Sequence, residues 1–303
     1  MKIKGERKIT MEETMIQEKG STPVTAGAVF RSAGIVIGSA ASFLVSSLIG
    51  GIICQKAGIS GYAAQFTTGL VSLAFYIVIL ILLKKKCVLT TKGNGFFGGL
   101  LTGLFMIYSS VVALASELFV STEGKTAKIV MPSELHFGSE QVWCILALFV
   151  AAGICEELLF RGIIFNVLRD LFGRSTVKGT VTAVFVSGIL FGLYHFLNLT
   201  AGIGLDAVLP QVVSTAGLGI FLCAVYARWG NIWITVFLHA LMDICVVLPG
   251  SMKNNENIVE SISSNMSDPR KYIGFFIYAA LAIYLLRKDK RPQMFTYSVS
   301  DDQ

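Results

Sequence analysis

Charged side chains are scarce in this chain of 303 residues: Asp, Glu, Lys and Arg make up 15%, whereas 54% of the residues are hydrophobic. A soluble globular chain carries charge on about a quarter of its residues. Apolar runs such as "SAGIVIGSAASFLVSSLIGGIIC" and "GLVSLAFYIVILILL" recur instead, at about the length that crosses a hydrocarbon core. The composition excludes an ordinary soluble protein and predicts an all-α, multi-pass integral membrane protein.

Other signals are also missing. The six cysteines form no CxxC pair and most lie in apolar runs, which gives neither a disulfide framework nor a zinc knuckle. The first 26 residues have no apolar centre, unlike a cleavable signal peptide, so we expect the first span to remain in the membrane. The net charge is +6, but the Lys and Arg residues flank the apolar runs and do not gather on one soluble domain. This distribution argues against nucleic-acid binding.

About eight transmembrane helices are expected. Their approximate ranges are 33–54, 65–83, 96–119, 142–168, 180–198, 208–228, 231–249 and 272–286. Of the 25 Lys and Arg residues, Arg161 lies inside a span; with the N-terminus inside, 18 of the others lie on the inner side and 6 on the outer side. This asymmetry predicts that both termini are cytoplasmic.

The chain divides into four parts on this pattern. Residues 1–32 form a polar N-terminal arm, and residues 33–120 hold three helices without a chemical motif. Residues 140–250 hold four helices and nearly all the intramembrane charge, and residues 251–303 hold a polar loop, the last helix and a tail. Three small-xxx-small patterns, at Gly34, Gly99 and Gly188, predict close helix packing.

Only a few ionisable side chains fall well inside the predicted spans, and they concentrate on the fourth, fifth and seventh. They are Glu156, Glu157, Arg161, His195, His239 and Asp243. An isolated charge at a helix centre costs roughly 2.5–3.5 kcal/mol on insertion scales. Structural contacts would need only Ser, Thr or Asn, so the group as a whole indicates a functional site. The third histidine, His136, lies in a loop and is expected to be solvated.

Helical spacing relates these residues to one another. Glu157 and Arg161 are four apart and can pair on their own helix, which leaves Glu156, about 100° round, free to face another group. His239 and Asp243 share one helix face. His195 comes late in its span, about 10 Å nearer the outer face at 1.5 Å per residue, so helix tilt or an early start must bring it level.

This combination suits hydrolysis. A carboxylate in a low-dielectric site can act as general base toward water, and an imidazole can orient that water or carry its proton. A second histidine with a polar neighbour can stabilise an oxyanion. No serine lies on the charged faces at a helical spacing from either histidine, and Cys155 diverges from Glu156 on the helix, so a Cys–His nucleophile is only a minor alternative.

The motifs "EELLFR", "FGLYH" and "HALMD", in this order on membrane segments, resemble the CPBP family of CAAX prenyl endopeptidases and bacteriocin-processing or self-immunity (Abi) proteins. The resemblance covers residues 140–250. It implies an intramembrane protease in which Glu156, together with His195, activates water. The resemblance assigns His239 and Asp243 to the oxyanion site, and Glu157 and Arg161 to the support of these residues. The prenyl endopeptidases have asparagine where this chain has Asp243.

Members of the family have been described as glutamic and as metallo-endopeptidases, so the resemblance leaves the cofactor open. Either no metal is required, or one divalent zinc-like ion is bound by residues among Glu156, His195, His239 and Asp243. The expected partners are the lipid bilayer and a membrane-associated peptide or protein substrate, with no nucleic acid. Resemblance to the bacterial branch implies that the protein lies in the plasma membrane. It also implies leader peptides, bacteriocin precursors or peptide pheromones as substrates.

Two other classes of function remain as alternatives. The first is a non-catalytic membrane scaffold or bacteriocin self-immunity protein, for which Glu156 would be dispensable. The second is a proton-coupled transporter, whose expected mark is an inverted repeat of broken helices. No second half of this sequence echoes the charged one.

Overall fold

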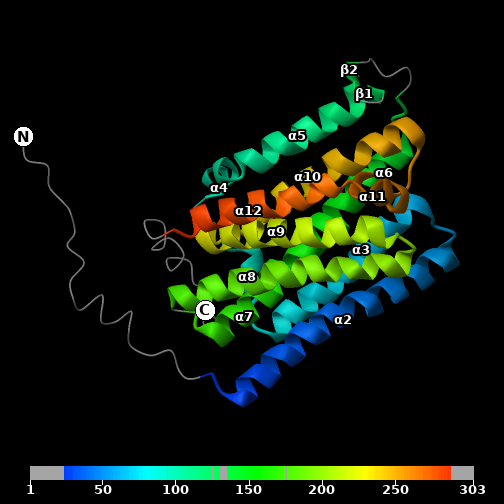
Figure 1. The fold of residues 1–303 in the computed structure, drawn as a ribbon. Coiled ribbons are helices and arrows are strands. Elements are labelled where there is room, and N and C mark those ends of the chain that lie inside the picture. Colours follow the sequence, from blue (N-terminus) through cyan, green and yellow to red (C-terminus); the bar gives the residue numbers. More distant parts are fainter. Residues whose placement is uncertain (1–23, 94, 124–125, 130–134, 175, 288–303) are drawn as a thin grey trace, which may run out of the picture.

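The chain folds into a bundle of long, roughly parallel helices, seen in a computed structural model that describes residues 24–93, 95–123, 126–129, 135–174 and 176–287 (Figure 1). Most of the predicted N-terminal arm lies outside these ranges. Helix α2 already begins at Ala26, where the Thr25 side chain accepts a hydrogen bond from the Ala28 amide, so the arm ends earlier than predicted.

Six helical stretches of the described chain are long and apolar enough to cross a membrane. They are α2 (Ala26–Ala57), α3 (Gly61–Leu82), Ser139–Phe172, Val177–Ala201, α9 (Leu205–Trp229) and α10 (Ile232–Asn254). The stretch Ser139–Phe172 joins α6 (Ser139–Ala147), the π-helices η2 (Leu148–Glu156) and η3 (Leu158–Ile164), and α7 (Phe165–Phe172). The stretch Val177–Ala201 joins α8 (Val177–Tyr194) and the 3₁₀-helix η4 (His195–Ala201).

The two remaining predicted spans form different kinds of helix. The third is broken into α4 (Phe96–Thr102) and α5 (Leu104–Phe119), which meet at Gly103 with a bend of 66°. The eighth is α12 (Tyr272–Leu285), which has only 14 residues. The all-α polytopic fold is therefore confirmed. The count of eight is approximate, because six or seven stretches meet the length criterion.

Two connections are more ordered than the sequence suggested. The predicted loop after the third span contains an antiparallel hairpin of β1 (Val120–Glu123) and β2 (Thr126–Ile129). The polar segment read as a solvated loop contains α11 (Ile258–Met266), so that prediction was wrong. The Asn257 side chain accepts hydrogen bonds from the Val259 and Glu260 amides, and the Glu260 carboxylate accepts one from the Asn257 amide; this capping box starts the helix. Two further 3₁₀ turns are η1 (Lys86–Leu89) and η5 (Pro269–Lys271).

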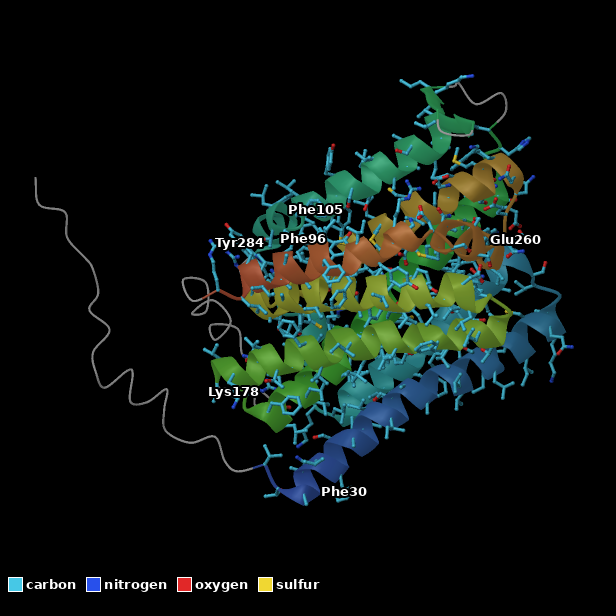
Figure 2. The ribbon with its side chains drawn as sticks, in the orientation of Figure 1. Phe30, Phe96, Phe105, Lys178, Glu260 and Tyr284 are labelled. Atoms are coloured by element: carbon cyan, nitrogen blue, oxygen red, sulfur yellow. The ribbon has the colours of Figure 1, made fainter. Side chains whose placement is uncertain are left out.

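Burial separates the centre of the bundle from its rim. In the apolar window of α9 83% of the residues are buried, against 17% in α2. α9 is packed by α8 and α12, while α5 packs against α10. Large apolar side chains such as Phe30 on α2 and Tyr284 on α12 project outward from the bundle, as expected for surfaces that contact lipid (Figure 2).

The small-xxx-small patterns differ in their contacts. A Cβ atom added at Gly188 would clash with the backbone of Ile220, and one at Gly192 would lie 2.5 Å from the Val212 carbonyl oxygen, so α8 and α9 need these glycines to approach. Gly99 faces the Ile234 side chain of α10 in a similar way. Gly34 has no such neighbour within 4 Å, so the packing predicted for that pattern is absent among the described residues.

Candidate active site

The segment that carries the two glutamates is wound as a π-helix rather than the α-helix assumed from the sequence. Glu156 ends η2, and Glu157 joins it to η3. π-Helical turns are rare and are frequently found at functional sites. Beyond them, the Asn166 side-chain amide donates hydrogen bonds of 3.0 Å to the carbonyl oxygens of both Arg161 and Gly162. These bonds satisfy backbone acceptors where the chain returns to α-helical winding.

Glu157 and Arg161 form a fully buried ion pair behind the pocket. Arg161 Nη1 lies 2.9 Å from Glu157 Oε1, and both side chains are 0% exposed. Arg161 Nη2 donates to the Gly219 carbonyl at 3.3 Å, and the guanidinium carbon lies 4.6 Å from the centroid of the Phe191 ring. The pair predicted from the i, i+4 spacing is therefore present, and it ties η3 to α8 and α9.

The same carboxylate orients the first of two histidines. His239 Nδ1 lies 2.8 Å from Glu157 Oε1. A carboxylate paired with Arg161 can only accept, so Nδ1 carries the proton and donates it. The other ring nitrogen, Nε2, lies 3.5 Å from Asp243 Oδ2 and 3.9 Å from Glu156 Oε2. Glu156 and Asp243 thus flank the free side of the imidazole, with 21% and 26% of their side chains exposed.

The second histidine reaches the same pocket from α8. His195 is the first residue of η4, and its Nδ1 lies 2.9 Å from the Phe191 carbonyl oxygen. That oxygen can only accept, so Nδ1 donates, and Nε2 of the neutral ring is left as an acceptor. The Phe191 ring stands edge-on to both imidazoles, with centroids 5.0 Å from His195 and 5.5 Å from His239. The difference in depth estimated from the sequence therefore does not separate the two histidines.

These side chains line a pocket of about 190 Å³. Its lining includes Glu156, His195, His239 and Asp243, and α11 contributes several more residues to it. Glu157 and Arg161 lie behind this set, and His136 is exposed on a loop. All six predicted site residues therefore gather in one place, while the third histidine stays apart as expected.

Four polar residues of the pocket on α8, η4 and α9 were not anticipated, and neither were Ser261 and Asn265 on α11. Asn198 donates a 2.8 Å hydrogen bond to Gln211, and Thr215 Oγ1 lies 3.3 Å from His195 Nδ1. Tyr194, next to His195 in the chain, is the fourth. Amide side chains in or beside apolar runs were the available signal for Asn198 and Gln211. Nothing in their spacing linked them to the histidines.

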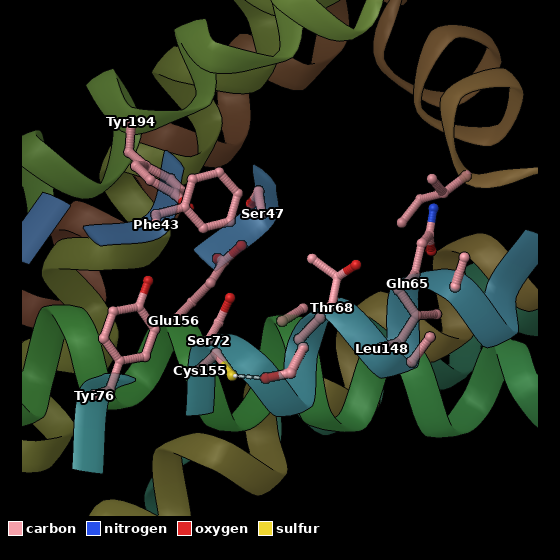
Figure 3. Close-up of a pocket in the computed structure, with 16 residues that line it drawn as sticks. Phe43, Ser47, Gln65, Thr68, Ser72, Tyr76, Leu148, Cys155, Glu156 and Tyr194 are labelled. Atoms are coloured by element: carbon pink, nitrogen blue, oxygen red, sulfur yellow. Dashed lines mark hydrogen bonds between the residues drawn. The ribbon is translucent and has the colours of Figure 1, made fainter. Parts of the chain in front are cut away.

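A second cavity, of about 320 Å³, adjoins this pocket between α2, α3 and η2. Both cavities are lined by Glu156, Phe43 and Tyr194. Figure 3 shows this cavity, with Glu156 between Tyr194 and Tyr76 and with Thr68 and Gln65 farther along α3. We call it the lateral groove. Its walls are mostly small or apolar, and Cys155 Sγ donates to the Gly69 carbonyl at 3.2 Å, as a packing thiol does.

The nitrogen and oxygen atoms of the pocket are potential metal ligands. Zinc takes nitrogen and oxygen ligands at about 2.0–2.2 Å, and catalytic sites use three protein ligands. Across the described ranges, no group of three or more His, Cys, Asp or Glu side chains has an arrangement that could hold a metal. The contacts described above account for the site residues without a metal ion.

Comparison with known proteins bears on the same segment. Residues 138–245 match the family model described as type II CAAX prenyl endopeptidase Rce1-like. A 117-residue stretch, 39% of the chain, is 26% identical to the Bacillus subtilis (strain 168) protein named "Putative membrane peptidase YdiL" and spans 41% of that relative's length. No solved structure matches the chain. The matched segment contains every motif residue of the pocket, and in this segment the chain is similar to the type II CAAX prenyl endopeptidases.

Proposed function

We propose that the protein is an intramembrane endopeptidase that hydrolyses a peptide bond in a membrane-associated peptide or protein, with Glu156 as the base that activates water. The observation that carries the proposal is the cluster around His239. An imidazole fixed by a buried carboxylate presents its other nitrogen to two pocket-facing carboxyl groups, Glu156 and Asp243. The similarity of residues 138–245 to the family model of type II CAAX prenyl endopeptidases adds support.

Glu156 and His195 act on the water molecule in this mechanism. Ionised Glu156 takes one proton from a water molecule, and the acceptor Nε2 of His195 orients that water through its second hydrogen. The water oxygen adds to the carbonyl carbon of the substrate. The proton held by Glu156 then passes to the leaving nitrogen as the C–N bond breaks, and the products are a carboxylic acid and an amine.

The opposite side of the pocket supports the developing charge. When both nitrogens of His239 carry protons, Nδ1 donates to Glu157, and Nε2 can donate to the carbonyl oxygen as it becomes an oxyanion. Asp243 can add a second donor only in its protonated form, because an ionised carboxylate only accepts. Arg161 compensates Glu157, so the orientation of His239 does not leave an unpaired charge in the protein interior.

The direct test uses purified protein in detergent or liposomes with a library of membrane-proximal peptides, both prenylated and unmodified. Cleavage products are identified by mass spectrometry for wild type, for Glu156→Gln and for Glu117→Gln. Glu117 is an exposed glutamate at the end of α5 and serves as the matched control. We expect cleavage by wild type and the control, and a loss of at least two orders of magnitude in Glu156→Gln, since general-base catalysis typically contributes about 10²–10⁴-fold.

A chelator arm separates the two protease subtypes. Cleavage that survives chelation supports water activated by Glu156 alone, whereas loss restored by zinc would assign Glu156, His195, His239 and Asp243 as metal ligands. The scaffold or self-immunity alternative makes a different prediction. If wild type cuts nothing and Glu156→Gln keeps the full cellular phenotype, the protease proposal is wrong.

A further inference from the structure

The hydroxyl group of Tyr194 has no assigned role and an unusual environment. It is buried, and it makes no hydrogen bond within the described part of the protein. Leaving a buried hydroxyl unsatisfied is costly, and groups of this kind in native structures call for an explanation. The sequence places Tyr194 at the end of α8, directly before His195.

The ring of Tyr194 is held firmly in place. Phe43 and Phe160 meet it edge-on, with ring centroids at 5.1 Å and 5.3 Å, and the His195 ring lies 6.0 Å away at 90°. Contacts of this kind fix the direction of an aromatic side chain without using its polar end. The hydroxyl is therefore positioned by packing alone and keeps its hydrogen-bonding capacity unused, although neighbouring side chains must move aside before a substrate can reach it.

Tyr194 also stands at a defined point on a path to the catalytic pocket. Together with Phe43 and Glu156 it lines both the lateral groove and the pocket of the two histidines. Figure 3 shows Tyr194 and Phe43 together on one side of Glu156, at the end of the groove. A polypeptide that lies in the groove and presents a bond to Glu156 therefore lies beside this pair. Phe43 belongs to α2, the least buried of the long helices, and is the member that can yield.

We propose that Tyr194 donates a hydrogen bond to a backbone carbonyl oxygen of the substrate, next to the bond that is cut and on the groove side of it. This inference rests on the proposed protease function and adds a condition on the substrate. A carbonyl inside an α-helix already accepts an amide hydrogen bond, and its second lone pair is hemmed in by the helix's own side chains, so an unwound carbonyl is the better acceptor. The substrate recognised here is therefore an extended segment, unwound beside the cleavage site, and not an intact helix.

The test compares two Tyr→Phe substitutions, each of which removes only a hydroxyl. Tyr226 is the matched control, because its hydroxyl is also buried without a hydrogen-bond partner but the residue lines neither cavity. With a peptide found to be cleaved, Tyr194→Phe should raise KM about 2- to 12-fold at nearly unchanged kcat, the range that one net hydrogen bond gives. Tyr226→Phe should match wild type. Elution of both variants as single detergent-solubilised species checks folding.

A second measurement locates the bond in the substrate. In each test peptide, one carbonyl oxygen near the cleavage site is replaced by sulfur. The replacement makes that one position a weaker hydrogen-bond acceptor. At the position that Tyr194 contacts, this change should slow wild type but should have no further effect on Tyr194→Phe, so the two effects are not additive.

Several outcomes would overturn the inference. They are wild-type kinetics in Tyr194→Phe, an equal loss in Tyr226→Phe, a fall in kcat at constant KM, or additive effects at every thioamide position. Glu156→Gln, assayed in parallel, keeps the two proposals apart. If Glu156→Gln is inactive and Tyr194→Phe equals wild type, the role of Tyr194 fails alone; if Glu156→Gln stays active, the protease proposal fails as well.

Discussion

Replacing Arg161 with methionine removes the partner of a carboxylate that solvent does not reach. The ion pair with Glu157 has a contact of 2.9 Å, and both side chains are 0% exposed. Removing one member of a buried pair costs about 3–5 kcal/mol, because the remaining charge is left uncompensated. The substitution also removes the hydrogen bond to the Gly219 carbonyl and the stacking on Phe191. We therefore expect the upper part of that range.

The free energy of unfolding can be measured in mixed micelles of increasing denaturing-detergent content, followed by tryptophan fluorescence. Arg270→Met is the control, because Arg270 pairs with Asp268 at 2.6 Å but is 85% exposed, and solvent screens such a pair. The control should unfold like wild type. The double variant Glu157→Gln, Arg161→Met should recover part of the loss, because no charge is then left buried. Wild-type stability in Arg161→Met, or a double variant that loses the sum of both single losses, would refute this reasoning.

Three further predictions address packing, the unusual carboxylate and the π-helix. Gly188→Ala should destabilise the fold by about 1–3 kcal/mol in the same unfolding assay, because its Cβ would meet the backbone of α9, whereas Gly34→Ala should be neutral or slightly stabilising. Asp243→Asn should keep peptide cleavage within about tenfold of wild type if the residue acts by hydrogen bonding, because asparagine can also donate; a larger loss in rate measurements would indicate that its charge is required. Asn166→Leu should cost about 1–3 kcal/mol on unfolding, because two backbone carbonyls lose their side-chain donor; an unchanged midpoint would show that other groups satisfy them.

The sequence predicted the helical membrane fold and singled out the six ionisable residues that the structure brings together, because both inferences depend on the cost of charge in lipid. A stretch such as Leu205–Trp229 can hardly be anything but a membrane helix, and Glu157 buried in such a stretch needs a partner. The i, i+4 spacing was sufficient to identify Arg161 as that partner. These inferences use local spacing and the properties of the solvent, which a single sequence contains.

What the sequence could not supply depends on contacts between distant segments. The meeting of His195 and His239 is arranged by Phe191, whose ring contacts both, and no spacing rule relates α8 to α10 in depth. Helix α11 was missed because its composition is polar; its start depends on the reciprocal bonds of Asn257 and Glu260. The π-helical winding was missed because the apolar pattern around Glu156 has no period that distinguishes it from an α-helix.

That winding has a consequence for how the site can change. A π-turn holds one residue more than an α-turn over about the same rotation, so deleting a single residue from Leu148–Glu156 would restore α-helical winding and leave the segments on either side in nearly their present orientation. Such a deletion would narrow the helix locally and remove one side chain from η2, which lines the lateral groove, while leaving the Glu157–Arg161–His239 contacts in place. A one-residue deletion in this segment is therefore a change that can reshape the groove around an unaltered set of charged residues.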